Sequence, residues 1–195
     1  MYFYDIIDYQ HRKDIFMKSI YILLINSNTL FSRTIRMLSK DEYTHASISF
    51  SDELFPFYSF GRKFTYLFAP AGLKKEPFDK GFFKHNKNIP CALLKINVDE
   101  EKYNLCKQYV EDLYNDDKRH GFNLIGLCAL KFGITIKRKN RMFCSEFVAT
   151  ALNNGKVTNF KNPTSIHPVD FLELPDIECL YKGLLKDIPQ KIHNI

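Results

Sequence analysis

Apolar positions along the chain fall into short blocks whose spacing predicts strands. "SIYILLINS" at 19–27 is a continuous run rich in Ile and Leu that ends in polar turn residues, which is typical of a buried strand. "THASISF" at 44–50 alternates between polar and apolar residues, as a strand with one buried face does. "PCALLKINV" at 90–98 and "IECLYKG" at 177–183 predict two more strands.

Other stretches show helical spacing. "TLFSRTIRMLSK" at 29–40 predicts a short helix, and the clearest helix is 99–116, where Asp99 stands at the N-cap position ahead of two glutamates. A second, more buried helix is predicted at 121–133. A third is predicted at 143–155, where Asn-Asn-Gly is a typical helix end.

The segments between these blocks complete the expected topology. Ser-Asp-Glu at 51–53 is turn-like and precedes "LFPFYSF" at 54–60, which predicts a hairpin with the histidine-bearing strand. Residues 61–88 are rich in Gly, Pro, Lys and Phe and predict a long connection with at most short strands. We therefore expect an α+β fold with a small antiparallel sheet, in a single domain at 19–195 that follows an N-terminal extension at 1–18.

The composition is that of an ordinary globular protein, with 45% hydrophobic and 26% charged residues in a chain of 195. The net charge of +6 is mild, and the only dense basic run is "KRKNR" at 137–141. Nucleic-acid-binding proteins usually concentrate basic residues in a stripe with aromatics or a known motif between them, so we expect no nucleic-acid partner. An anionic substrate or a membrane surface stays open as a partner.

Cysteine usage argues against metal and redox chemistry. The cysteines are widely spaced and form no Cys-x-x-Cys pair, so we expect neither a zinc site nor a redox dithiol, and no cofactor. The apolar run near the N-terminus is too short for a signal peptide or a membrane span. We therefore expect a cytoplasmic protein with reduced thiols. The five thiols are Cys91, Cys106, Cys128, Cys144 and Cys179.

Cys144, in "RMFCSEFVATAL", has two interpretations. On a helix it shares a face with Phe147, Val148 and Ala151, so it can be one more small core residue. In the first helical turn, however, unpaired backbone N–H groups and the helix dipole favour a thiolate, and the basic run just before it adds to this effect. The same N–H groups can hold a developing oxyanion. A nucleophile also needs a base.

Of the six histidines, His45 is the best placed to be that base. The alternation directs His45, Ser47 and Ser49 to the face away from the core, where small hydroxyl side chains leave room for a substrate. A strand also restrains an imidazole better than a loop does. Alone, this histidine would be interpreted as structural, and its pairing with Cys144 changes that interpretation. The others are typical of solvated or capping residues: His11, His85, His120, His167 and His193.

The predicted hairpin supplies a third residue. If its loop has three residues, His45 lies directly across from Ser59 on the same face. The Ser59 hydroxyl would then orient the imidazole, although more weakly than a carboxylate would. A two-residue loop or a bulge at Pro56 would shift this register, and Glu146 and Asp170 are then the next candidates.

The order of these motifs resembles a known family. A strand and a short helix lead to Thr-His at the start of a strand, and about a hundred residues later Phe-Cys-Ser-Glu opens a helix. This arrangement is similar to the circularly permuted papain-like amidases of the YaeF/YiiX type, within the NlpC superfamily. Ordinary members place the cysteine helix before the histidine strand. "HPVDFLEL" at 167–174 is also similar to their Pro-x-Asp segment, and the resemblance covers roughly 19–175.

The resemblance implies a small antiparallel sheet packed by the cysteine helix, with the thiol facing the imidazole across a cleft. Carried over, Cys144 is the nucleophile, His45 is the general base and then the acid, and the Cys144 N–H is part of the oxyanion hole. The family's third residue usually lies on the strand after the histidine, often as a carboxylate. In this chain Ser59 stands there instead.

Three functions stay open. The first is a cysteine-dependent hydrolase or acyltransferase that acts on an amide or ester bond in a small molecule, peptide or lipid. The second is a non-catalytic binding module that keeps the fold, which Ser59 in place of a carboxylate favours. The third is a membrane-surface protein acting on lipids, as permuted relatives can, with the aromatic and basic "FGRKFTYLF" at 60–68 as its contact.

Overall fold

The computed structural model describes residues 17–26, 42–62, 71–116, 120–130 and 132–188. Its strands are β1 (Met17–Ile25), β2 (His45–Ser49), β3 (Phe57–Arg62), β4 (Ala71–Glu76), β5 (Pro90–Asp99), β6 (Gly121–Phe122), β7 (Arg141–Met142) and β8 (Ile177–Leu184). The helices are α3 (Gly81–His85), α4 (Glu100–Asn115), α5 (Leu124–Leu130) and α6 (Cys144–Asn154). Three short 3-10 turns are η1 (Pro163–Ser165), η2 (Pro168–Glu173) and η3 (Leu185–Asp187).

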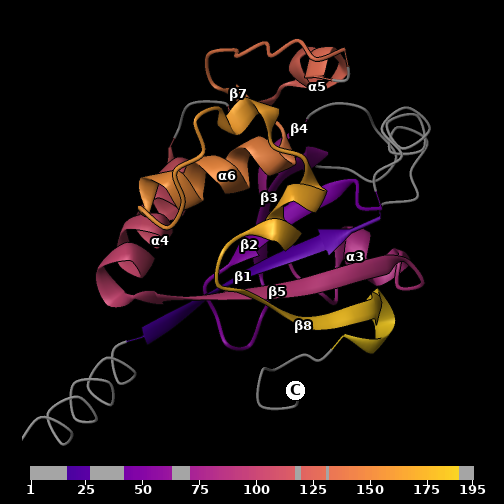
Figure 1. The fold of residues 1–195 in the computed structure, drawn as a ribbon. Coiled ribbons are helices and arrows are strands. Elements are labelled where there is room, and N and C mark those ends of the chain that lie inside the picture. The colour runs from indigo at the N-terminus through magenta and orange to yellow at the C-terminus, as the bar shows by residue number, and fades with distance from the viewer. Residues whose placement is uncertain (1–16, 27–41, 63–70, 117–119, 131, 189–195) are drawn as a thin grey trace, which may run out of the picture.

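Within the described residues, eight strands form one curled sheet in the order β7-β6-β4-β3-β2-β1-β5-β8 (Figure 1). Neighbouring strands are antiparallel except for the short pair β6 and β7. The α+β class is therefore confirmed, but the sheet is larger than expected. It is larger because β4, β6 and β7 extend it in segments where the sequence predicted a connection or a helix.

The central strand β1 is buried on both faces, which explains its continuous apolar run. On one face α4 and α6 cover the sheet (Figure 1), and Val110 and Phe147 pack there against alternate residues of β1. On the other face, the remaining residues of β1 pack with Phe57, Phe83 and Leu185. Two apolar layers therefore enclose the middle of the sheet and fix the strands that carry the candidate site.

Most predicted elements are confirmed to within a few residues. β1 begins two residues before the predicted start, and the Asp99 side chain accepts a hydrogen bond from the backbone N–H of Lys102 at 2.9 Å, as an N-cap does. The predicted helix at 29–40 lies outside the described residues. None of the helices that the structure describes is long and apolar enough to cross a membrane.

The hairpin register differs from the prediction. Ile48 pairs with Tyr58, whereas a three-residue loop would have paired Tyr58 with Ala46. The connection from β2 to β3 is longer than predicted because Leu54 turns into the core with φ 64° and is fully buried. Pro56 has no N–H for the strand ladder, so β3 begins only after it.

The predicted buried helix at 121–133 is also different. Only α5 is helical in it, and Leu124 and Ile125 at its start are exposed. The element lies beyond the sheet edge at β7, away from the two buried layers (Figure 1). Its apolar residues are therefore on the surface, although their spacing is that of a core helix.

Candidate active site

Cys144 is the first residue of α6, as predicted. The carboxylate of Glu146 fixes this helix start, because its Oε2 accepts the N–H of Phe143 at 3.3 Å and its Oε1 accepts the Thr164 hydroxyl at 2.9 Å. Glu146 is therefore a buried helix cap rather than a partner of His45. Asp170 has the same role in η2, where its Oδ2 accepts the N–H of His167 at 2.7 Å.

The Cys144 thiol and the His45 ring meet at the start of α6 and the start of β2. The His45 ring and the backbone N–H groups of Ala46 and Ser145 interact with the sulfur, and each of these interactions lowers the pKa of the thiol. Both side chains are largely buried, with 6% of Cys144 and 15% of His45 exposed. The structure thus brings together the two residues that the sequence pairs across almost a hundred positions.

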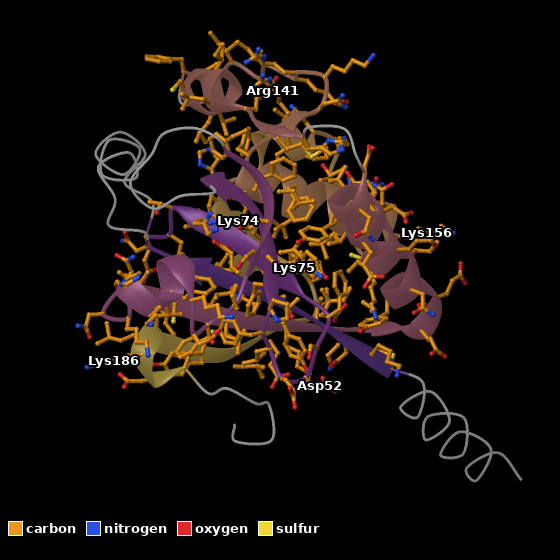
Figure 2. All side chains as sticks on the ribbon, turned by 180° about the vertical axis from the view of Figure 1, so that it is seen from behind. Asp52, Lys74, Lys75, Arg141, Lys156 and Lys186 are labelled. Carbon is orange, nitrogen blue, oxygen red and sulfur yellow. The ribbon has the colours of Figure 1, made fainter. Side chains whose placement is uncertain are left out.

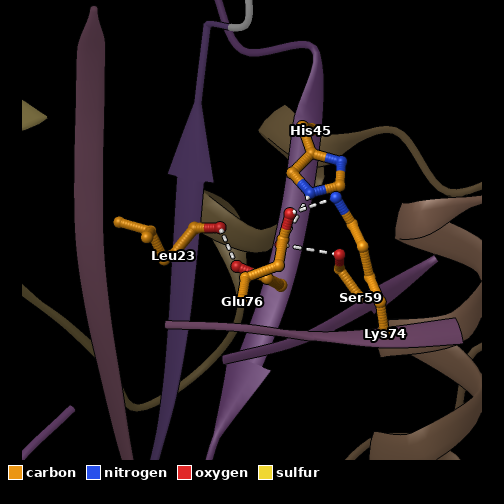
Figure 3. A network of polar contacts seen from close by, with 6 residues as sticks. Leu23, His45, Ser59, Lys74 and Glu76 are labelled. Atoms are coloured by element: carbon orange, nitrogen blue, oxygen red, sulfur yellow. Dashed lines mark hydrogen bonds and ion pairs between the residues drawn. The ribbon is translucent and has the colours of Figure 1, made fainter. Parts of the chain in front are cut away.

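The third member of the site is Glu76, which the sequence analysis missed. Its Oε2 lies 3.2 Å from Nε2 of His45 (Figure 3). Because Nε2 points to Glu76, Nδ1 is the ring nitrogen that remains for the sulfur. A buried carboxylate in this position restrains the imidazole and stabilises its charged form, as the acidic member of a Cys-His site does.

Ser59 and Lys74 hold the Glu76 carboxylate in place. The Ser59 hydroxyl donates to Oε2 at 2.6 Å, and the Lys74 ammonium lies 2.8 Å from Oε1 (Figure 3). Ser59 is fully buried and supports Glu76, so the prediction that it hydrogen-bonds His45 directly is wrong. The physical reason is the register of β2 and β3, together with the pairing of Ser59 with Lys74 on β4.

Burial opposes each charge in this cluster, and neighbouring opposite charges outweigh it. Burial lowers the pKa of His45, but the Glu76 carboxylate and the Cys144 sulfur raise it from 6.5 to about 9. Burial raises the pKa of Glu76, yet Lys74 and His45 bring it well below its ordinary range. Burial also raises the pKa of Cys144, and His45 with two backbone N–H groups lowers it below 9.0. These shifts favour a thiolate–imidazolium pair over the neutral pair.

The basic run before Cys144 contributes less than expected. The largest influences that lower the pKa of the thiol come from His45 and from the backbone N–H groups, not from residues 137–141, most of which are exposed. The other cysteines differ from Cys144, because burial raises the pKa of both Cys91 and Cys106 to about 12. The pKa of the Cys144 thiol is therefore lowered by groups in direct contact with it.

The face of β2 that carries His45 is closed along most of its length. Ser47 and Ser49, expected beside an open space, are buried, and their hydroxyls donate to the carbonyls of Leu23 at 3.3 Å and Pro56 at 3.2 Å. The second apolar layer covers this face, and of the residues of β2 only His45 is partly exposed. In the part of the chain that the structure describes, no group of three or more His, Cys, Asp or Glu side chains could hold a metal ion.

One signal could have pointed to Glu76. In "AGLKKE", Lys74 and Glu76 are two positions apart, so a strand would place both on one face. The Gly, Pro, Lys and Phe content of 61–88 predicts a long connection with at most short strands, so the shared face of Lys74 and Glu76 does not stand out. Comparison with known proteins adds no assignment: no protein-family model matches this chain, and no curated protein is significantly similar to it.

Proposed function

We propose that this protein is a cysteine-dependent hydrolase or acyltransferase with a permuted papain-like arrangement, acting on an amide or ester bond. The observation that carries the proposal is the buried chain of contacts from Cys144 through His45 to Glu76. A structural cysteine needs no charged partner, whereas here the thiol interacts with His45, which in turn contacts the Glu76 carboxylate that Lys74 pairs with. A pKa lowered from its ordinary value is the property that a thiol nucleophile requires.

In the first half of the proposed reaction, the Cys144 thiolate attacks the carbonyl carbon and a carbon–sulfur bond forms. The N–H of Cys144 lies at the helix N-terminus, where it has no intrahelical acceptor, and it binds the developing oxyanion. The His45 imidazolium gives its proton to the leaving nitrogen or oxygen. The bond to the leaving group then breaks, and a thioester remains on Cys144.

In the second half, the neutral imidazole of His45 takes a proton from water or from an acceptor hydroxyl or amine, which attacks the thioester. Collapse of the intermediate releases the acyl product and restores the thiolate and the imidazolium. Glu76 stays ionised throughout and holds the ring in one orientation. Water as acceptor makes the protein a hydrolase, and another nucleophile makes it an acyltransferase.

The alternative of a non-catalytic binding module rested on Ser59 standing where relatives have a carboxylate. Glu76 supplies that carboxylate from the next strand, and Ser59 supports it. No other observation favours loss of turnover. The basic and aromatic segment 60–68, offered for the lipid-directed alternative, lies largely outside the described residues.

Trapping of the acyl-enzyme tests the proposal. The protein is incubated with activated p-nitrophenyl esters of short and long acyl chains, quenched in acid, and read by intact and peptide mass spectrometry. We expect one acyl group on the peptide that contains Cys144, with a burst of p-nitrophenol. His45→Ala should keep the fold, raise the pKa of the thiol and lower the acylation rate by about 10² to 10⁴-fold. Acylation spread over the exposed Cys128 and Cys179, and unchanged in His45→Ala, contradicts the proposal.

A further inference from the structure

The segment between β6 and β7, residues 123–140, displays several exposed apolar side chains. Among the described residues, the two buried apolar layers include Phe122 and Met142 at its ends and no side chain between them. Seven large hydrophobic residues are exposed in the described chain, and four of them lie in this segment. These are Leu124 (44% exposed), Ile125 (54%), Phe132 (76%) and Ile134 (56%). Such a concentration on a surface marks an interaction site.

The same region carries the positive charge of the protein. Residues 118–145 contain seven Lys and Arg and no Asp or Glu, whereas the rest of the chain has 21 Lys and Arg and 22 Asp and Glu, a net charge of −1. Lys137, Lys139 and Arg141 are exposed beside the apolar residues. The net charge of +6 is therefore concentrated in one part of the sequence.

Buried polar contacts hold the segment in this exposed shape. Asn123 is fully buried, and its Nδ2 donates to the carbonyl of Ile136 at 2.8 Å while its Oδ1 accepts the N–H of Gly126 at 3.0 Å. Its own N–H donates to the carbonyl of Met142 at 3.0 Å. These hydrogen bonds link the start of α5 to Ile136 and to β7, and they keep the apolar side chains of the segment on the surface.

We propose that residues 123–130 and 132–141 form a docking surface for an anionic phospholipid bilayer. Large aliphatic and aromatic side chains flanked by lysine and arginine are the combination that inserts at the bilayer interface and attracts acidic headgroups. A nucleic-acid surface fits less well, because Leu124, Ile125 and Ile134 offer neither stacking nor hydrogen bonds to bases. The surface lies at one end of the molecule, around α5 and β7 (Figure 1).

This surface is adjacent to the candidate nucleophile. Only Met142 and Phe143 separate Arg141 from Cys144, and three residue steps span at most about 11 Å. Docking would therefore hold the N-terminus of α6 close to the headgroup region. Bilayer binding itself does not depend on the chemistry of Cys144. If the function proposed above holds, docking would also give the thiol access to amides or esters carried by lipids.

Cosedimentation with vesicles tests the surface directly. The full chain is mixed with phosphatidylcholine vesicles made with and without phosphatidylglycerol, at low and high salt. We expect binding to the anionic vesicles that weakens with salt. Lys137→Gln with Lys139→Gln should lower the partition coefficient roughly 30-fold, since each basic residue contributes about 1 kcal/mol. Phe132→Ser should lower it about tenfold.

Matched variants elsewhere on the surface are the controls. Lys156→Gln with Lys186→Gln removes two lysines that lie away from Arg141 (Figure 2), and Leu184→Ser removes an exposed leucine of β8. These variants should bind as wild type does, and Cys144→Ala should also bind, even if the proposed catalysis fails. Equal binding to neutral and anionic vesicles, or equal losses in the control variants, would overturn the proposal. Tighter binding to an oligonucleotide than to vesicles, or self-association through Phe132 without vesicle binding, would do so too.

Discussion

Glu76 lies 3.2 Å from His45 through Oε2 and Nε2, although the two residues stand on strands that are not neighbours in the sheet. β3 runs between β2 and β4, and the hydroxyl of its Ser59 donates a hydrogen bond to the same carboxylate oxygen. The carboxylate reaches the imidazole across this strand. The site therefore depends on three adjacent strands being in register, and each side chain in it can be tested separately.

Cys144 should react as a thiolate at lower pH than an ordinary thiol, because His45 and the backbone N–H groups lower its pKa. Iodoacetamide labelling from pH 5 to 9, followed at the Cys144 peptide by mass spectrometry, measures this. A free cysteine peptide labelled in the same tube is the reference, and it loses about tenfold in rate for each pH unit below its pKa. A Cys144 profile that coincides with the reference would remove the nucleophile assignment.

Glu76→Gln should lower the pKa of His45 by about one to three units, because the nearby negative charge that favours the imidazolium is lost. NMR titration of the imidazole measures the shift, and turnover of an acyl ester should fall with it. Glu178→Gln is the control, since Glu178 is an exposed residue of β8 paired with Lys95. An unchanged His45 titration in Glu76→Gln would show that the contact contributes nothing.

Lys74→Met should make the protein more sensitive to acid. Lys74 lowers the pKa of Glu76, and a group with a depressed pKa stabilises the fold above its ordinary value of 4.5 and loses that contribution as pH falls through the folded pKa. Without the Lys74 ammonium, the stabilising contribution of ionised Glu76 is lost from a higher pH downward. Urea unfolding at pH 4 to 5 should therefore give a lower free energy of unfolding for Lys74→Met than for wild type. Lys75→Met is a matched control, because Lys75 packs over the Tyr114 ring at 4.6 Å instead. Equal acid sensitivity in both variants would contradict the role of Lys74.

Stability should fall on the alkaline side as well. The pKa of His45 is raised from 6.5 to about 9, so its contribution is fully present below pH 6.5 and is lost as pH rises through about 9. Urea unfolding of wild type between pH 6 and 10 measures this loss. His45→Ala should show a smaller decline across the same range, and a decline of equal size in the variant would assign it to other groups.

Ser59→Ala should affect stability more than turnover. It removes a hydrogen bond to a charged acceptor, which typically contributes about 1.5 to 3 kcal/mol, and leaves the contact between His45 and Glu76 in place. Ser59→Asp should destabilise strongly, because it sets a second carboxylate against Glu76. Ser19→Ala, which removes an exposed hydrogen bond to Asn97, is the control for urea unfolding. A gain of activity in Ser59→Asp would contradict this and would instead support a direct contact between residue 59 and His45.

Local patterns in the sequence predict the candidate nucleophile and the candidate base, but not the carboxylate beside them. His45 and Cys144 each stand at the first position of an element whose periodicity is clear, so their placement follows from a few neighbouring residues. Glu76 acquires its role only through the pairing of β4 with β3, which no local pattern encodes. The predicted register of the hairpin was wrong because Leu54 is buried and lengthens the turn. Burial of a turn residue depends on packing partners far along the chain, which the local sequence does not show.

The α5 helix shows a second limit of prediction from the sequence. Its apolar periodicity is real, but periodicity does not show whether another layer covers the apolar face. The sequence therefore predicts a more buried helix at 121–133, whereas Leu124 and Ile125 are exposed. The absence of acidic residues from 118 to 145 was visible in the sequence and is the signal that distinguishes this surface from a core helix.

The Lys74 ammonium makes the site electroneutral at each stage of the proposed cycle. At rest, its charge and that of the imidazolium balance the Cys144 thiolate and the Glu76 carboxylate. In the thioester stage the proton has left His45 and the thiolate charge is gone, so ammonium and carboxylate still balance. Without Lys74 both stages would hold one uncompensated negative charge in a largely buried place and would repel an approaching anion. On the proposed function, the lysine would therefore allow both anionic and neutral acyl donors to approach the same thiol.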